Sequence, residues 1–146
     1  MKKPSKEFYY VAVKVFFEKS GRLFIFKDRF GKWDLPGGRL LKNEFYTSLE
    51  KVIARKIKEE LGQKVYYKLG KPLVFMRHER KEPNPLGRPK VRIFAIGYRA
   101  KFISGEIKLS SMHTEYKWVQ LKNLKPERYF IGGWLKGVKK YLCLRK

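Results

Sequence analysis

Two adjacent glutamates near the middle of the chain, Glu59 and Glu60, are the residues whose type and spacing most directly suggest chemistry. On a helix they share a face with Lys56, which lies three and four positions earlier. Clustered carboxylates form a hard oxygen site that suits Mg²⁺ or Mn²⁺, and these ions bridge phosphate oxygens and help to activate water. Exposed helices carry paired glutamates routinely, so the surrounding sequence must distinguish a metal site from a solvated helix end.

A helix that ends at these glutamates is the clearest secondary-structure signal in the sequence. Thr47 and Ser48 are candidate N-cap residues, and Gly62 is a C-terminal stop. Between them, apolar residues recur at helical spacing: Val52, Ile53, Ile57 and Leu61. We therefore expect a helix between the cap and Gly62, with this apolar face on a core.

A glycine-containing turn precedes the helix in the stretch WDLPGGRLL. Pro36, Gly37 and Gly38 permit a tight bend and close backbone approach, which exposes main-chain carbonyls and amides. A helix that starts several residues later can bring its side chains beside these backbone groups. The turn and the helix together are therefore a better candidate site than either one alone.

The order of these features resembles the Nudix box, G-x5-E-x7-R-E-U-x-E-E-x-G-U, in which U is a bulky aliphatic residue. In GRLLKNE, five residues separate Gly38 from Glu44, and RKIKEELG follows at 55–62. The preceding KWDLPGG is similar to the family's lead-in, and HTEYKWV at 113–119 is similar to one of its later strands. The resemblance covers nearly the whole chain in the order of its elements.

The resemblance implies an α+β fold with a single Nudix-like domain over residues 1–146. This domain would be an α/β/α sandwich with a mixed sheet, a box helix and a C-terminal helix. The resemblance also implies a divalent-metal-dependent hydrolase with Mg²⁺ or Mn²⁺ as its cofactor. The substrate would be a nucleoside diphosphate linked to another group, that is, a nucleotide sugar, a nucleoside triphosphate or a dinucleoside polyphosphate.

The same resemblance implies roles for the box residues. Glu59 and Glu60 would bind the metal, with Glu60 the more essential ligand and Glu59 also catalytic. Gly37 or Gly38 would offer a main-chain carbonyl to the metal, and Arg55 would orient a carboxylate by a charge-assisted hydrogen bond. The positions that match the structural residues of the box are Gly38, Glu44, Arg55 and Gly62.

The sequence departs from the box in three places. Ten residues, 45–54, separate Glu44 from Arg55 where the box has seven, and FYT is interpreted as an insertion in the loop. Lys56 replaces a glutamate that usually binds the metal, and its ammonium would repel a divalent ion. Met112 stands where many relatives carry a glutamate or glutamine, and a thioether is a poor ligand for Mg²⁺.

One branch of the family tolerates such losses. GDP-mannose mannosyl hydrolases are similar in the PGGR sequence and in having a histidine where His113 stands. By this resemblance, His113 would be the general base for attack at the sugar carbon, and Arg39 would neutralise the leaving diphosphate. His78 falls near another histidine of that branch, and Arg39, Lys56 and His78 would contact the substrate. The alternative for either histidine is an ordinary surface or edge residue.

The remaining sequence predicts strands at residues 8–17, 23–27, 64–70, 72–78, 91–102 and 115–121. A proline-rich loop at 79–90 is either a substrate lid or a flexible hairpin tip. A C-terminal amphipathic helix packs on the sheet or lies on a membrane surface, with an apolar face made of Ile131, Trp134, Leu135, Val138, Tyr141 and Leu142. Trp33 and Trp118 are interpreted as core residues, with base stacking as the alternative.

The composition indicates a single domain with a hydrophobic core and a strongly basic surface. Of 146 residues, 43% are hydrophobic, and 36 Lys and Arg against 13 Asp and Glu give a net charge of +23. This excess favours polyanionic partners such as nucleotides or RNA, although surface lysines also serve solubility. Cys143, the lone cysteine, excludes an internal disulfide, and Lys14 interrupts the N-terminal apolar run, so we expect a cytoplasmic protein.

Two classes of function follow from these observations. The first is a Nudix hydrolase of a nucleotide-type small molecule. The second is a non-catalytic Nudix-fold module that binds nucleotide or RNA, because Lys56 can hold phosphate without a metal. RNA binding rests on charge alone, since the sequence carries no aromatic RNP strand and no GXXG loop. No membrane partner is expected, and the sequence does not determine the oligomeric state, for which a homodimer is one candidate.

Overall fold

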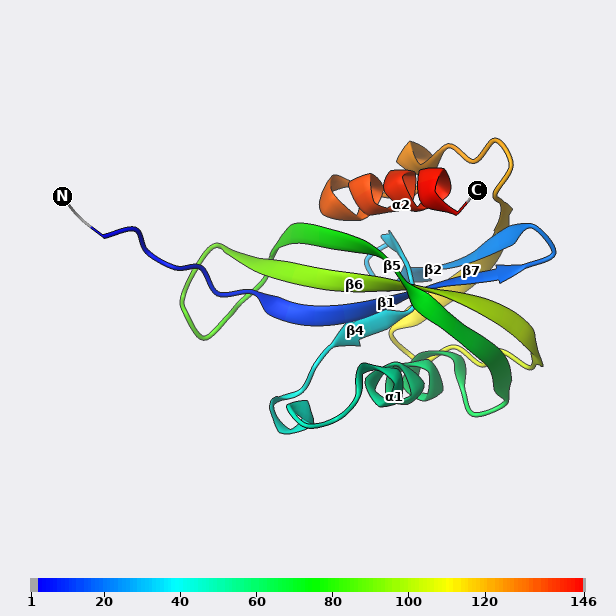
Figure 1. Cartoon of the computed structure of the whole chain (residues 1–146), viewed down its shortest axis with the longest axis horizontal. Coiled ribbons are helices and arrows are strands. Elements are labelled where there is room, and N and C mark those ends of the chain that lie inside the picture. Colours follow the sequence, from blue (N-terminus) through cyan, green and yellow to red (C-terminus); the bar gives the residue numbers. More distant parts are fainter. Residues whose placement is uncertain (1–2, 146) are drawn as a thin grey trace.

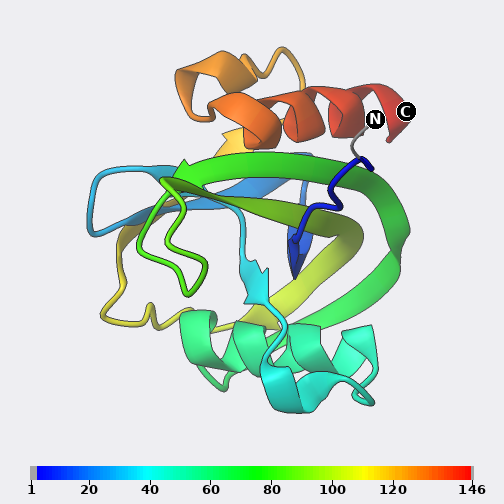
Figure 2. The ribbon, with the colours of Figure 1, turned by 90° about the vertical axis from the view of Figure 1, so that its left-hand side faces the viewer.

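The computed structural model describes residues 3–145 as a seven-stranded sheet with an α-helix on each face (Figures 1 and 2). The helices are α1 (Leu49–Leu61) and α2 (Gly132–Leu144), with short 3-10 helices η1 (Lys42–Glu44) and η2 (Pro126–Arg128). The strands are β1 (Tyr10–Lys19), β2 (Arg22–Asp28), β3 (Trp33–Asp34), β4 (Gly37–Arg39), β5 (Val65–Lys81), β6 (Lys90–Gly105) and β7 (His113–Gln120). This arrangement confirms the predicted α/β/α sandwich.

The sheet is mixed, as the sequence predicts, and β1 is its central strand. The strand β1 pairs in parallel with β6 along most of its length. It pairs antiparallel with β4 near its start and with β2 at its end. The remaining strands extend the sheet in antiparallel fashion, with β5 on β6 and both β3 and β7 on β2.

The long strand β5 differs from the sequence prediction. The strands predicted at 64–70 and 72–78 are one continuous strand, and its pairing with β6 is irregular around Pro72. Proline lacks the amide hydrogen of a regular ladder, so a local irregularity lets the strand continue past it. The predicted loop at 79–90 is also shorter, at 82–89, because its flanking residues join the β5–β6 hairpin.

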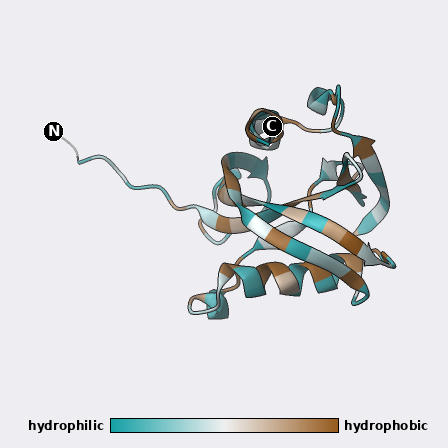
Figure 3. Ribbon diagram, turned by 45° about the vertical axis from the view of Figure 1, so that its right-hand side comes forward, coloured by the Kyte–Doolittle hydropathy of each residue, from teal (hydrophilic) through white to brown (hydrophobic). Residues whose placement is uncertain are grey.

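The helix α1 packs its predicted apolar face on one side of the sheet. Ser48 is the N-cap, and its hydroxyl accepts a hydrogen bond of 3.3 Å from the amide of Lys51. Gly62 ends the helix with a φ of +89°, a conformation that favours glycine. Figure 3 shows hydrophobic residues alternating with hydrophilic ones along this helix. The buried cluster on this face contains Val13, Val15, Phe17, Phe24, Phe26, Val52, Ile53, Ile57 and Leu61.

The helix α2 covers the opposite face of the sheet. Trp134, Val138 and Tyr141 are buried there, and the Tyr141 ring stacks on Phe16 with 3.9 Å between ring centroids. The predicted apolar face is wrong at Ile131, which precedes the helix as its N-cap and is 65% exposed. No helix among the described residues is long and apolar enough to cross a membrane.

Trp33 and Trp118, which the sequence left between core packing and base stacking, are both partly buried. Trp118 packs against the cluster under α1, in edge contact with Phe24 at a centroid distance of 5.3 Å. Trp33 packs against the α2 side of the core, in edge contact with Tyr129 at 5.6 Å. These contacts support the interpretation of both as core residues.

Candidate functional site

The glycine turn fixes the backbone at the centre of the site. The strand β4 pairs with β1 so closely that a side chain on Gly37 would overlap the Val13 carbonyl oxygen. Gly37 also has a φ of +132°, which side chains rarely adopt. Only glycine therefore lets this turn lie against β1 and present its amide to the helix beside it.

Glu60, in the last turn of α1, contacts this turn from inside the protein. Its side chain is buried, with the residue only 8% exposed, and Oε1 accepts a hydrogen bond of 2.8 Å from the amide of Gly37. Burial raises the pKa of Glu60 to about 7, against the opposing effects of the Lys14 ammonium and the Gly37 hydrogen bond. Glu60 therefore takes up and releases a proton near neutral pH.

His113, the first residue of β7, lies next to Glu60. Its Nε2 atom is 3.9 Å from Glu60 Oε2, and its ring stacks on Phe26 with centroids 3.7 Å apart. Ser110 Oγ lies 3.2 Å from Nδ1, and the Ser110 amide donates to the Glu60 carbonyl at 3.1 Å. Burial lowers the pKa of His113, so the ring is neutral at pH 7. The structure thus brings two titratable side chains, Glu60 and His113, together.

Arg55 links the loop before α1 to the exposed glutamate of the box. Its guanidinium donates to both oxygens of Glu44 at 2.7 Å and to Glu59 Oε1 at 2.9 Å. The hydrogen bond from Arg55 lowers the pKa of Glu44, which stays ionised. The inserted residues 45–47 leave this contact intact because they lie in the turn between η1 and α1, where Phe45 is 81% exposed.

Lys56 reaches from α1 over the glycine turn. A methyl group added at Gly38 would meet Lys56 Cε at 2.5 Å and Nζ at 3.0 Å, so the end of the lysine side chain fills the space beside Gly38. The same Nζ is 3.2 Å from Glu59 Oε2. The lysine therefore holds its charge between the turn and the carboxylates of the helix.

This arrangement does not fit a divalent ion. Within residues 3–145, no group of three or more His, Cys, Asp or Glu side chains is placed to hold a metal. The expected ligand Glu59 has one oxygen engaged by Arg55 and the other by Lys56, and Glu60 Oε1 is engaged by Gly37. Mg²⁺ is usually held by one or two carboxylates together with waters and substrate phosphates; here both oxygens of Glu59 are already engaged, and the Lys56 ammonium stands beside them.

A buried ion pair that sequence reasoning missed lies beside Glu60. Lys14 is 6% exposed, and its Nζ contacts both oxygens of Asp34, at 3.0 and 3.1 Å, and the Leu35 carbonyl at 3.1 Å. Lysine is rarely buried without a partner. A lysine inside the otherwise apolar strand β1 was therefore a signal for a buried acidic partner, although the partner's position was not readable.

Asp34 also faces a cavity of about 400 Å³ on the α2 side of the sheet. His78 lines this cavity rather than the Lys56 region, and its ring stacks on Trp134 with centroids 4.4 Å apart. Burial lowers the pKa of His78 to about 4, so its Nδ1 is a neutral acceptor for the Gly133 amide at 3.1 Å. The lining also includes aromatic and basic residues, among them Trp33, Arg80, Arg128 and Tyr129.

Two further residues singled out in the sequence point elsewhere. Arg39 forms a two-pronged ion pair with Glu82 of the 82–89 loop, at 2.8 and 2.5 Å, and its guanidinium lies 4.6 Å from the centre of the Tyr10 ring. Met112 is 49% exposed. Arg39 therefore ties the glycine turn to the loop, and it reaches a substrate only by exchanging Glu82 for it.

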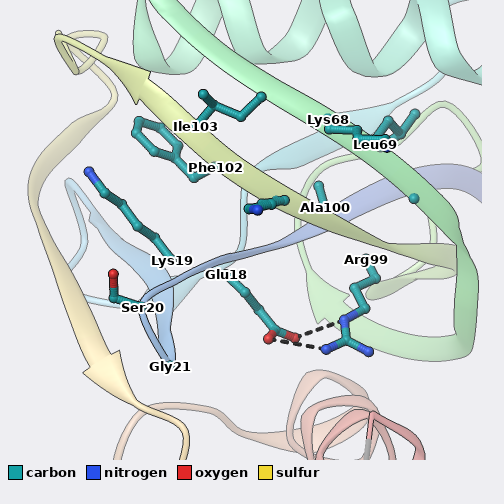
Figure 4. A pocket seen from close by; sticks show the side chains of 12 residues that line it. Glu18, Lys19, Ser20, Gly21, Lys68, Leu69, Arg99, Ala100, Phe102 and Ile103 are labelled. Carbon is teal, nitrogen blue, oxygen red and sulfur yellow. Dashed lines mark hydrogen bonds and ion pairs between the residues drawn. The ribbon is translucent and has the colours of Figure 1, made fainter.

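A second cavity, of about 820 Å³, lies at the far end of β1 (Figure 4). Its one acidic side chain, Glu18, is bonded to Arg99, Arg145 and Tyr141. Figure 4 shows the Glu18–Arg99 pair. These bonds saturate the carboxylate, so Glu18 fastens the C-terminal end of α2 to the sheet.

Solved structures share this fold. A MutT protein from Methanosarcina mazei Go1 matches with a TM-score of 0.70 at 21% identity, over 98% of this chain and 99% of that one. A MutT NUDIX hydrolase from Burkholderia pseudomallei matches with a TM-score of 0.66 at 22% identity, over 92% and 98%. An ADP-ribose pyrophosphatase from Streptococcus suis 89-1591 gives 0.66 at 15% identity, over 94% and 92%. The architecture is that of the Nudix hydrolases.

The sequence itself assigns the family. The NUDIX domain profile matches residues 9–135, and the chain therefore belongs to the NUDIX domain family. This confirms the resemblance found in the box. No curated protein matches the sequence. The likeness to the GDP-mannose mannosyl hydrolase branch stays a prediction.

Proposed function

We propose that this protein hydrolyses a nucleoside diphosphate linked to another group, with Glu60 and His113 as its proton-transfer pair. The observation that carries the proposal is the approach of His113 Nε2 to Glu60 Oε2 at 3.9 Å, beside the glycine turn. The buried carboxyl titrates at about pH 7, and catalytic acids and bases work best near the operating pH. Membership of the NUDIX family supports a hydrolase, and one similar structure is an ADP-ribose pyrophosphatase.

The proposed step uses both groups. The neutral His113 takes a proton from water as the water oxygen forms its bond to the electrophilic atom, either a phosphorus or the sugar carbon. The bond from that atom to the leaving oxygen breaks, and protonated Glu60 gives its proton to that oxygen. His113 then returns its proton to Glu60, which restores the starting state.

The neighbouring cavity supports a nucleotide-type substrate. Its aromatic side chains offer flat apolar surfaces, and its arginines offer donors suited to phosphate oxygens. The buried Lys14–Asp34 pair connects the cavity with Glu60, because Asp34 lines the cavity and Lys14 pairs with Gly37 in the strand register. We therefore take this cavity as the candidate site for the nucleotide part of the substrate.

A panel of nucleotide sugars, nucleoside triphosphates and dinucleoside polyphosphates tests the proposal. Each is incubated with Mg²⁺, with Mn²⁺ and with a chelator, and both products are identified. Release of free sugar with a nucleoside diphosphate indicates cleavage at carbon, whereas a monophosphate indicates cleavage at phosphorus. The metal series also tests the predicted Mg²⁺ or Mn²⁺ dependence.

Two substitutions test the proton-transfer pair. We expect Glu60→Gln and His113→Gln each to lower kcat by at least about a hundredfold, because general acid–base groups contribute on the order of 10²–10⁴ in rate. Glu50→Gln is the matched control, since Glu50 is an exposed glutamate in the first turn of the same helix. Retention of native kcat by Glu60→Gln would sink the assignment.

A second candidate is a Nudix-fold module that binds nucleotide or RNA without turnover. The observation that favours it is the Lys56 ammonium against Gly38, together with the net charge of +23. Nucleotide binding without product release under every metal condition would support this candidate over the hydrolase.

A further inference from the structure

The position of the Lys56 side chain sets this box apart from a divalent-metal site. The end of its side chain fills the space beside Gly38, where an added methyl group would meet Cε at 2.5 Å and Nζ at 3.0 Å, and Nζ lies 3.2 Å from Glu59 Oε2. The side chain is 21% exposed, so a ligand can reach the ammonium from solvent. The charge therefore stands at the meeting point of the glycine turn and the box helix.

The charges around this ammonium balance without a divalent ion. Arg55 and Lys56 face the ionised carboxylates of Glu44 and Glu59. Glu60 Oε1 already accepts a hydrogen bond of 2.8 Å from the Gly37 amide. A divalent ion at the turn would place two further positive charges beside two existing cations, which is strongly unfavourable at such short range.

The Lys56–Glu59 contact is also one that a ligand can replace. Glu59 is half exposed, with its side chain at 50%, and an ion pair in such a position contributes about 0–1 kcal/mol. If Lys56 turns to a phosphate oxygen, Glu59 keeps its hydrogen bond from Arg55. No buried carboxylate is left without a partner, so the exchange costs little.

We infer that the Lys56 ammonium serves as a built-in cation that binds the diphosphate group of the ligand directly, without a divalent metal. Lysine binds phosphate as a compact point charge. The inference rests on the proposed function only for the chemical class of the ligand. It concerns binding, which holds or fails independently of turnover.

Calorimetric titration with inorganic pyrophosphate tests the inference. The native chain is titrated once with a chelator present and once with Mg²⁺. We expect binding in the chelator, with an affinity within about threefold of that in Mg²⁺. This comparison needs no variant, and a requirement for Mg²⁺ in the native chain would overturn the inference.

Three variants assign the effect to the ammonium. Lys56→Gln should weaken pyrophosphate binding in the chelator by at least about tenfold, and Lys56→Arg, which keeps the charge, should retain it within about threefold. Lys58→Gln is the matched control, because Lys58 is exposed on the same helix. Unchanged affinity in Lys56→Gln, or equal losses in Lys56→Gln and Lys58→Gln, would overturn the inference.

A charge reversal gives an independent check. Lys56→Glu adds a carboxylate beside Gly38 and Glu59 and removes the competing cation, so Mg²⁺ should bind this variant measurably tighter than the native chain. Equal Mg²⁺ affinity in the two proteins would overturn the inference. These titrations also separate the two proposals: absence of hydrolysis with intact metal-free pyrophosphate binding counts against the proposed function alone.

Discussion

At the scale of single residues, adjacent glutamates of the box have opposite environments. Partial burial raises the pKa of Glu59, but the hydrogen bonds from Arg55 and Lys56 outweigh it and hold that pKa below its ordinary value. Burial raises the pKa of Glu60 to about 7. Helical spacing predicts this difference, because Glu60 lies three residues after Ile57 on the buried face. How far the pKa of Glu60 rises depends on the turn packed against it, which spacing does not describe.

The buried carboxyl of Glu60 makes stability depend on pH in a defined direction. Its folded pKa of about 7 exceeds the ordinary value of 4.5, so between these values the folded state holds more protons than the unfolded state. Its contribution is therefore fully present below pH 4.5 and is lost as pH rises through about 7. The lost stability is roughly 3 kcal/mol, because each tenfold difference in proton affinity between the two states corresponds to about 1.4 kcal/mol.

Denaturant unfolding from pH 4 to pH 8 measures this effect as a difference between proteins. Glu60→Gln cannot ionise, so its free energy of unfolding relative to the native chain should rise with pH across the window from 4.5 to 7. Taking the difference cancels the titrating groups that do not contact Glu60, whereas His113, 3.9 Å away, is coupled to it, and the lowered pKa of His113 acts in the opposite direction. A constant difference across that window would contradict the assignment.

Other residue-scale features depend on contacts between distant segments, and the sequence did not predict them. Lys14 meets Asp34 because β1 pairs with β4. Asp34 lies three residues before the first residue of β4, so this pairing brings it to β1. Ser110 meets His113 because the loop before β7 is bonded to the carbonyl of Glu60. Residue types alone mark such groups as candidates, but only the strand pairing fixes their partners.

At the scale of elements, the sequence predicted the features that depend only on residues close together in the chain. The cap, apolar face and glycine stop of α1 lie within the helix and its ends, and all three are present. The prediction failed where a neighbouring strand decides the outcome: pairing with β6 carries β5 through Pro72 and shortens the loop to 82–89. Ile131 lies outside its predicted helical face because α2 starts one residue later.

The N-cap of α1 gives an element-scale prediction. Ser48→Ala removes the side-chain acceptor of the Lys51 amide, and such losses destabilise a protein by about 1 kcal/mol. Ser48 lies at the start of α1, whereas Glu59 and Glu60 lie in its last turn. The variant should therefore lower stability while leaving kcat near the native value. Thr47→Ala is the control, since the cap lies at the next residue. Urea unfolding of the two variants measures the difference, and equal midpoints would contradict the capping role.

At the scale of the whole molecule, the box helix and the cavity lie on opposite faces of the sheet. The box helix α1 lies on one face of the sheet and α2 on the other (Figures 1 and 2), and the cavity lies beside α2. The central strand β1 connects them, because Lys14 bonds to Asp34 at the cavity and lowers the pKa of Glu60 by its charge. The Lys14–Asp34 pair therefore links the box side of the sheet to the cavity beside α2.

The net charge of +23 is also a property of the whole molecule. The salt dependence of binding distinguishes RNA held by the general basic surface from a phosphate group held at Lys56. RNA held by the general basic surface displaces many counterions, so its affinity should fall on the order of a hundredfold or more between about 50 and 200 mM salt. Pyrophosphate held at Lys56 displaces few, and its affinity should fall by less than about tenfold. Fluorescence anisotropy with a labelled single-stranded RNA and calorimetry with pyrophosphate measure how each affinity depends on salt.

Substitution of glutamine for the exposed Lys136, Lys139 and Lys140 of α2 should weaken RNA binding and leave pyrophosphate binding unchanged. RNA binding that resists salt and is displaced by pyrophosphate would instead place RNA in the box and favour the binding module over the hydrolase.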